Sequence, residues 1–223
     1  MTGDWVDTPP ADEGASSKIA TVDEIVLRGM AKWPDVRAVY GWLLLDRRGD
    51  WRIKGELIAN PGINAFIGRN YGHDDEGLWF FQNGPQRVYV SLDYTPLIYR
   101  IDQTPGTLPA LECHTGKPVA IVKGAWLDET GTVLLQTEHG IGLVHDRDLG
   151  QLIPCLTGLD GNPLDDIALA VAMDSFQQQR PAPLWIRYGG GQVRIEPIRS
   201  NEVPARFGFV PNPVQPAGQA ECR

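Results

Sequence analysis

The sequence has few cysteines, no long hydrophobic run and no excess of positive charge. Three cysteines in 223 residues form an odd, sparse set, so we predict no disulfide framework and expect reduced thiols in a cytoplasmic protein. The longest apolar runs, at 42–45 and 167–173, are far shorter than the ~20 residues that a membrane-spanning helix needs, and we expect no membrane partner. The formal charge of -8 argues against nucleic acid as a partner, because binding to phosphates depends on Lys and Arg.

Motifs for catalysis and cofactor binding are also missing. The chain has no Gly-x-Ser-x-Gly elbow, no P-loop and no paired-cysteine zinc motif, so we expect no cofactor and assign no catalytic residue. Cys113 stands next to His114, but neighbouring side chains usually point apart, and an inert thiol is the favoured interpretation. His139 and His145 are a weak candidate metal site, because their interval fits no known ligand motif.

The sequence does contain hairpin signatures interrupted by helical segments, which predicts an α+β fold. Asp46 and Gly49 have the spacing of a tight turn between apolar strands, and Asp128 and Gly131 repeat it. We therefore predict antiparallel hairpins over residues 36–58 and 119–137. We also expect both glycines to adopt a positive φ, which a β-branched side chain resists.

Further matches suggest two tandem, duplicated units, each an antiparallel β-hairpin, a helix and a second β-hairpin. Leu78-Trp79 aligns with Leu184-Trp185 when gaps are allowed, and a glycine and a glutamine follow each pair at the same spacing. Duplication explains why the elements recur in order. The alternative is that hairpins use Asp and Gly at their turns for a shared steric reason.

Four helices are predicted from their start signals, the shortest of them capped by Asp146 and running through Leu149, Leu152 and Ile153. Asn60-Pro61 indicates a short helix within the first unit, with Asn as the cap and Pro at the first position. A capping box at Thr21–Glu24 predicts an extra helix over 21–33. Asn162-Pro163 predicts a second extra helix over 164–176.

Composition divides the chain into five segments. Proline-rich, polar ends predict disordered tails at 1–18 and 211–223. A stretch rich in proline and glycine at 106–118 predicts a linker. The first repeat unit is then expected at 19–105 and the second at 119–210.

The first unit resembles a known family of proteins. The similarity rests on Trp51–Ile58, on an apolar helix that ends near Arg69, on the paired strands of Leu78–Leu92 and on Asp93-Tyr-Thr-Pro96. This pattern is similar to an uncharacterised bacterial family, domain of unknown function twelve eighty-five, over about residues 40–100. The resemblance implies repeated structural units and a role in signalling through binding, with no assigned activity.

Two acid–arginine pairs are the candidate binding residues. Glu56 and Arg69 follow the first hairpin, and Glu138 and Arg147 follow its counterpart. A salt bridge that joins helix to hairpin in each unit is the favoured interpretation, and a ligand contact is the alternative.

The absence of a catalytic constellation favours a non-enzymatic binding or signalling protein, whose partner is a protein or a small molecule. The alternative is a small hydrolase-like enzyme whose site forms between the two halves. Such a site would use residues that meet only in space, drawn from Glu56, Glu138, His139 and His145.

Overall fold

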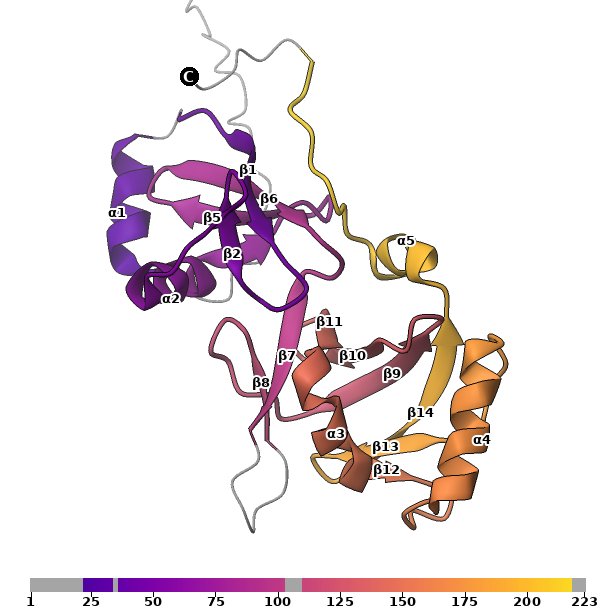
Figure 1. The fold of residues 1–223 in the computed structure, drawn as a ribbon. Helices are drawn as coiled ribbons and strands as arrows, with labels where there is room; N and C mark the ends of the chain where they lie inside the picture. The colour runs from indigo at the N-terminus through magenta and orange to yellow at the C-terminus, as the bar shows by residue number, and fades with distance from the viewer. Residues whose placement is uncertain (1–21, 34–35, 103–109, 218–223) are drawn as a thin grey trace, which may run out of the picture.

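Two lobes, each built on one β-sheet, form an α+β structure (Figure 1). The computed structural model describes residues 22–33, 36–102 and 110–217. The first lobe ends at Leu92, and the second lobe extends from Leu97 to Phe207. None of the helices in the described ranges is long and apolar enough to cross a membrane.

The helices are α1 (Glu24–Lys32), α2 (Pro61–Arg69), α3 (Leu149–Leu152), α4 (Asp166–Gln177) and α5 (Val203–Phe207). The strands of the first lobe are β1 (Val39–Leu45), β2 (Trp51–Ile53), β3 (Glu56–Leu57), β4 (Tyr71–His73), β5 (Trp79–Asn83) and β6 (Gln86–Leu92). Those of the second lobe are β7 (Leu97–Asp102), β8 (Ala110–Cys113), β9 (Val122–Asp128), β10 (Val133–Thr137), β11 (Ile141–Val144), β12 (Leu156–Thr157), β13 (Trp185–Tyr188) and β14 (Gly191–Ile198).

The two predicted hairpins are confirmed. β1 pairs with β2, and β9 pairs with β10, both antiparallel. Gly49 and Gly131 close the turns with φ values of 82° and 85°, in the left-handed region that favours glycine. Each glycine N–H donates to the carbonyl oxygen of the turn's aspartate at 3.0 Å.

Strand order is the same in the two lobes. The first sheet runs β3-β2-β1-β6-β5-β4, and the second contains β11-β10-β9-β14-β13-β12 in the corresponding order. The central pairs β1–β6 and β9–β14 are both parallel, whereas the hairpins beside them are antiparallel. This common topology is compatible with duplication, which stays a prediction.

The hairpin pairing corrects one detail of the sequence alignment. The β5–β6 hairpin closes at Asn83 and Gln86, and the β13–β14 hairpin closes at Tyr188 and Gly191. Trp79 lies four residues before Asn83, whereas Trp185 lies three residues before Tyr188. The two matched Leu-Trp pairs are therefore offset by one residue within their hairpins. Because a shift of one residue exchanges the faces of a strand, the two tryptophans do not occupy equivalent positions.

Helices form at the predicted places, α5 was not predicted, and the starts of α1 and α4 differ from the predicted ones. Asn60 caps α2, as its Oδ1 accepts from the N–H groups of Gly62 and Ile63. The cap of α4 is Asp165, not Asn162, because the Asp165 carboxylate accepts from the Ala168 N–H at 2.7 Å. The N-cap of α1 is Asp23, which makes no side-chain cap, and the predicted cap at Thr21 lies outside the described residues.

The change from one sheet to the other comes earlier than the predicted linker at 106–118. β7 and β8 pair with each other, and β7 also pairs with β11 of the second sheet. The chain therefore leaves the first sheet after Leu92. The C-terminal segment then returns to the first lobe (Figure 1), where the Leu92 N–H donates to the Pro211 carbonyl at 2.7 Å.

One continuous hydrophobic core holds the lobes together. It includes Trp51 and Tyr71 of the first lobe and Leu111 and Leu134 of the second, all almost fully buried. At the interface the His114 ring contacts Trp51 and Tyr71, with centroid separations of 5.5 and 5.8 Å. The lobes are thus fixed against each other by side chains on both sides of the boundary.

Candidate functional site

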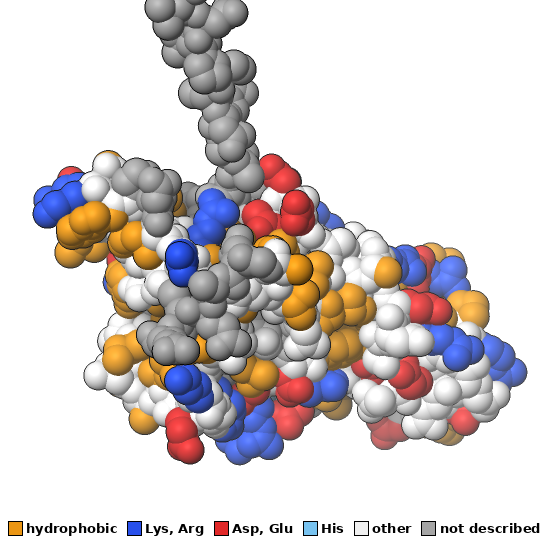
Figure 2. Space-filling model, turned by 90° about the horizontal axis from the view of Figure 1, so that it is seen from above, with side chains coloured by type: hydrophobic (Ala, Val, Ile, Leu, Met, Phe, Trp, Pro, Cys, Tyr) orange, Lys and Arg blue, Asp and Glu red, His pale blue; other side chains and the backbone are white. Residues whose placement is uncertain are grey.

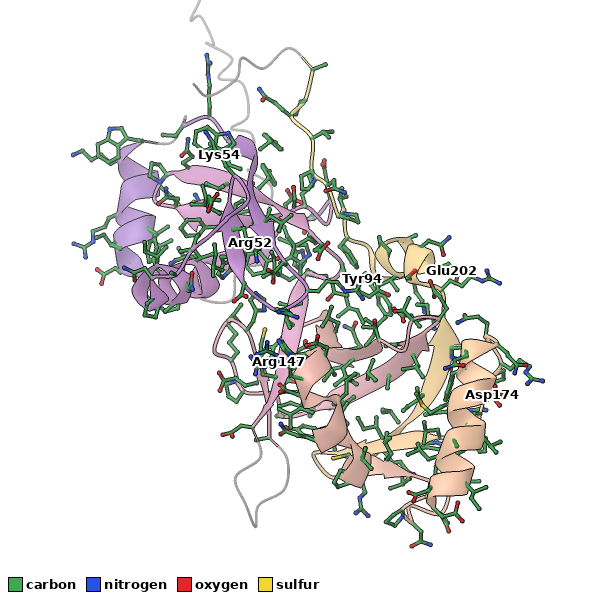
Figure 3. The ribbon with its side chains drawn as sticks, in the orientation of Figure 1. Arg52, Lys54, Tyr94, Arg147, Asp174 and Glu202 are labelled. Atoms are coloured by element: carbon green, nitrogen blue, oxygen red, sulfur yellow. The ribbon has the colours of Figure 1, made fainter. Side chains whose placement is uncertain are left out.

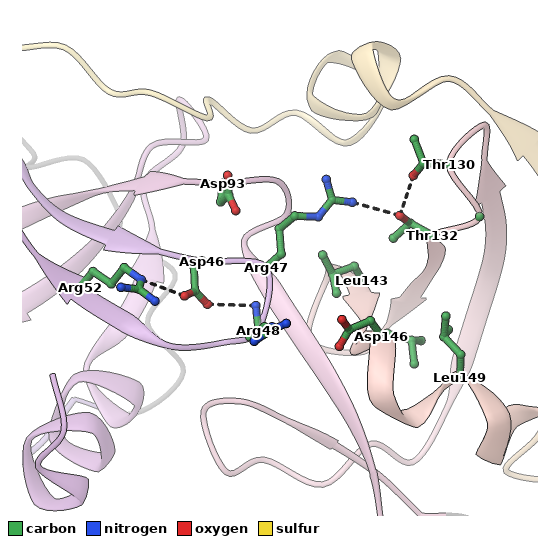
Figure 4. Close-up of a pocket in the computed structure, with 12 residues that line it drawn as sticks. Asp46, Arg47, Arg48, Arg52, Asp93, Thr130, Thr132, Leu143, Asp146 and Leu149 are labelled. Carbon is green, nitrogen blue, oxygen red and sulfur yellow. Dashed lines mark hydrogen bonds and ion pairs between the residues drawn. The ribbon is translucent and has the colours of Figure 1, made fainter. Parts of the chain in front are cut away.

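A cleft of about 530 Å³ opens where the turns of the two lobes meet (Figure 4). One wall is the β1–β2 turn, and the opposite wall is the β9–β10 turn, with the start of the 3₁₀ segment that precedes α3 beneath them. The lining residues are Asp46, Arg47, Arg48, Arg52, Asp93, Thr130, Gly131, Thr132, Leu143, Val144, Asp146 and Leu149. We call this space the inter-lobe cleft.

The two turns that wall the cleft have the same hydrogen-bond pattern. Asp46 Oδ1 accepts from the N–H groups of Arg48 and Asp50, at 2.9 and 3.0 Å. Asp128 Oδ1 accepts in the same way from Thr130 and Thr132, at 2.9 Å each. An aspartate that accepts from the backbone two and four residues later fixes the turn, so both walls are preformed.

Contacts among Arg47, Thr132, Tyr94 and Asp128 join the two walls, and we call this set of contacts the latch. The Arg47 guanidinium crosses from the first turn to Thr132 Oγ1 of the second, at 3.0 Å, and lies over the Tyr94 ring at 4.5 Å from its centroid. Tyr94 in turn donates its hydroxyl hydrogen to Asp128 Oδ2 at 2.8 Å. Figure 4 shows Arg47 reaching toward Thr132 across the cleft. These bonds define the spacing of the two turns.

Hydrogen bonds, mainly from its own turn, lower the pKa of Asp128. Burial raises the pKa of its carboxyl group, but hydrogen bonds from Thr130, Thr132 and Tyr94 together outweigh that effect and lower the pKa below the ordinary value. The pKa of Tyr94 is raised, first by burial and then by its hydrogen bond to Asp128. At neutral pH the latch therefore contains a phenol that donates and a carboxylate that accepts.

Two charged side chains in the cleft remain available to a ligand. Arg52 Nε is paired with Asp46 Oδ2 at 2.9 Å. By contrast, the exposed Arg48 guanidinium and Asp93 carboxylate form no ion pair or side-chain hydrogen bond within the described ranges. Arg48 and Asp93 are thus a cation and an anion of the cleft whose charged groups have no partner among the described residues.

The structure does not join Glu56 to Arg69. The Arg69 guanidinium instead pairs with Asp23 at 3.2 Å and connects the end of α2 to the start of α1. This pairing lowers the pKa of Asp23. Glu56 is exposed on the edge strand β3, so the predicted Glu56–Arg69 salt bridge is wrong, and a binding role for either residue stays a prediction.

Glu138 and Arg147 do not form an ion pair with each other either. Glu138 accepts from the backbone N–H groups of Ala120 and Ile121, at 2.6 and 3.2 Å. Arg147 is exposed, and its backbone N–H donates to His145 Nδ1 at 3.1 Å (Figure 3 labels Arg147 beside α3). The predicted salt bridge in the second unit is therefore wrong as well.

A second, smaller cavity of about 260 Å³ takes Glu138 and His139 from the second lobe and His73 and Trp79 from the first. Cys113 also lines it, but burial raises the pKa of this thiol, which works against a reactive thiolate. Two of the four residues of the hydrolase hypothesis, Glu138 and His139, share this cavity. Glu56 and His145 do not line it.

The two histidines of the candidate metal site form hydrogen bonds with different parts of the chain. His139 Nε2 lies 2.8 Å from the Pro118 carbonyl oxygen, while His145 is buried and its Nδ1 accepts from Arg147. No group of three or more potential metal ligands occurs in the part of the chain that the structure describes. The geometry does not gather a ligand set around these histidines.

Sequence reasoning did not select Arg48, Asp93 or Thr132. It identified the Asp46–Gly49 turn, which contains Arg47 and Arg48, but assigned no role to these two arginines. The available indication was the repeated Asp-x-x-Gly, since equivalent turns of two packed units can meet. The spacing of residues along the sequence does not show that the two turns face each other.

Comparison with known proteins supplies the family. No curated protein matches the chain. A DUF1285 family protein from Silicibacter pomeroyi DSS-3 has a similar fold, with a TM-score of 0.50 and 12% identity over 83% of this chain and 92% of that one. A DUF1285 family protein from Shewanella baltica OS155 matches 51% of this chain and 91% of its own length, with 19% identity and a TM-score of 0.39. The resemblance inferred from the first unit is confirmed at the level of fold. Residues 22–214 match the DUF2944 family, described as a protein of unknown function (DUF2946), and the chain belongs to that family.

Proposed function

We propose that this protein binds a small polar ligand in the inter-lobe cleft and acts through that binding, without chemistry on the ligand. The observation that carries the proposal is that the charged groups of Arg48 and Asp93 have no partner among the described residues and line a cleft walled by both lobes. Its volume of about 530 Å³ lies within the ~300–1,000 Å³ typical of small-molecule sites.

The two charges favour a ligand that is itself zwitterionic, such as an amino acid or a dipeptide. The planar guanidinium of Arg48 can hold a carboxylate through two parallel hydrogen bonds. The carboxylate of Asp93 can accept from an ammonium group. Thr130, whose hydroxyl lies 3.0 Å from that of Thr132, adds a neutral polar contact on the far wall.

Binding of such a ligand would serve a signalling role, which is part of the proposal. A ligand that contacts both lobes stabilises the arrangement in which both sets of contacts form. The latch through Arg47 spans the same cleft, so the ligand and the latch favour the same spacing of the two turns. We infer that the bound and free states differ in how firmly the lobes are held together.

The test is a thermal-shift screen of amino acids and dipeptides, followed by calorimetric titration of the compounds that raise the melting temperature. We expect Arg48→Ala and Asp93→Asn each to weaken binding by about tenfold or more, the loss typical of a hydrogen bond to a charged group. Arg180→Ala, an exposed arginine after α4, is the matched control and should bind as wild type does. Equal affinity in all variants, or no stabilising compound, would reject the proposal.

A further inference from the structure

A third cavity, separate from the inter-lobe cleft and from the cavity that Glu138 and His139 line, lies in the first lobe between α2 and the sheet. It has a volume of about 330 Å³, and its walls are mainly apolar. Leu43, Phe66 and Phe81 form its interior, while Trp42, Ile53 and Ile63 line its mouth. We call it the α2 pocket.

The mouth of the α2 pocket exposes large apolar side chains to solvent. Trp42, Ile53 and Ile63 are 39%, 46% and 48% exposed. Single exposed apolar residues are ordinary, but these three border one cavity, and contiguous apolar surface of this kind marks a binding site. Figure 2 shows hydrophobic side chains exposed on the part of the surface that the first lobe forms.

A lysine in an unfavourable backbone conformation stands beside this mouth. Lys54 and Gly55 form the β2–β3 turn with φ values of 50° and 87°, a two-residue turn whose first position favours asparagine over lysine. Lys54 Nζ lies 3.9 Å from the centre of the Trp42 ring. Figure 3 labels Lys54 at the outer end of the first lobe.

The ammonium group of Lys54 has no carboxylate neighbour that neutralises it. Within residues 22–33, 36–102 and 110–217, no ion pair joins this group to another side chain. The closest acidic residue along the chain is Glu56, which pairs through its backbone with Ile53 across β2 and β3. A cation beside an apolar cavity matches a ligand with an anionic head and an apolar body.

We propose that the α2 pocket binds a small amphipathic carboxylic acid, with its hydrocarbon part among Phe66 and Phe81 and its carboxylate on Lys54. Burial of the hydrocarbon supplies most of the affinity, because transfer of each CH₂ group from water is favourable by a roughly constant amount. The carboxylate supplies selectivity, because an alcohol of the same chain length forms no ion pair with Lys54 and a cationic head group is repelled by it.

The test compares decanoate, decanol and decyltrimethylammonium, each below the concentration at which it forms micelles, in calorimetric titrations of the full chain. We expect one saturable site that prefers decanoate to the other two by about tenfold, the gain typical of a charge-assisted hydrogen bond. Ile63→Gln should weaken decanoate and decanol together, because it makes the mouth of the pocket polar.

Lys54→Asn separates loss of binding from loss of folding. Asparagine suits the left-handed position, so this variant should melt above wild type while its affinity for decanoate falls about tenfold. Lys54→Arg should keep the preference for decanoate, and Lys123→Asn, which changes an exposed lysine on β9, should leave it unaltered. Equal binding of decanoate and decanol, unchanged binding by Lys54→Asn, or many weak sites without saturation would overturn the proposal.

Discussion

At the scale of single residues, Gly49 and Gly131 have the same backbone role in different surroundings. Both have positive φ, but a Cβ atom on Gly49 would lie 3.1 Å from His114 Cβ, whereas one on Gly131 would meet no atom within 4 Å. We expect Gly131→Val to cost about 1–2 kcal/mol of the free energy of unfolding through backbone strain alone. Gly49→Val should cost more, because the added side chain also crowds the interface.

Chemical denaturation of both variants measures this difference. Gly131→Ala is the control that separates strain at Cα from the extra branching of valine. Equal destabilisation by Gly131→Val and Gly49→Val, or no loss of stability in either variant, would contradict this expectation.

His114 predicts how stability depends on pH. Burial lowers the pKa of this imidazole from 6.5 to about 3. Its Nδ1 accepts from the Ile98 N–H at 3.2 Å, and its Nε2 is buried without a hydrogen-bond partner among the described residues. The folded protein therefore holds His114 neutral, although the unfolded chain takes up a proton below pH 6.5.

The sign follows from this difference in proton uptake. The contribution of His114 is complete above pH 6.5 and is lost as the pH falls from 6.5 toward 3, at up to ~1.4 kcal/mol per pH unit. His114→Asn, whose Oδ1 can still accept from Ile98, should remove this part of the slope. Unfolding titrations at several pH values that give wild type and variant the same slope would contradict the assignment.

At the scale of elements, two Asn-Pro pairs that look alike in sequence have different roles. Asn60 accepts two backbone N–H groups at the start of α2, so Asn60→Ala should cost about 0.5–2 kcal/mol, the usual effect of losing an N-cap. Asn162 lies in a turn before α4 and bonds to Asp160, so Asn162→Ala should change stability by less than ~0.5 kcal/mol. Denaturant melts of the two variants side by side test the distinction, and equal losses would contradict it.

These elements also show what local sequence can predict. The Asp-x-x-Gly turns and the Asn60 cap were predictable because residues two to four apart make the bonds that define them. The start of α4 was not, since Asp165 and Asn162 are both good caps, and only the structure shows that Pro163 forms a β-bridge with Thr157 and that the helix begins after it. The true partner of Arg69 was not predictable either, because Arg69 bonds to Asp23, which is remote in sequence.

At the scale of the whole molecule, function is proposed where equivalent elements of two lobes meet. Each turn supplies only one wall, and the inter-lobe cleft exists because the core packs the lobes with their β1–β2 and β9–β10 turns face to face. That juxtaposition depends on contacts distant in sequence, which explains why Arg48 and Asp93 could not be chosen from sequence. The same packing places the Arg47 latch across the cleft.

The most direct test of this account is an NMR titration of the isotope-labelled full chain with the tightest-binding compound from the amino-acid and dipeptide panel. We predict that backbone amide shifts change on both walls of the cleft, at Arg48 and Asp93 of one side and at Thr130 and Thr132 of the other. Arg48→Ala should abolish the changes on both walls at the same ligand concentration. Shifts confined to one lobe, or centred on Trp42 at the α2 pocket, would contradict a ligand site between the lobes.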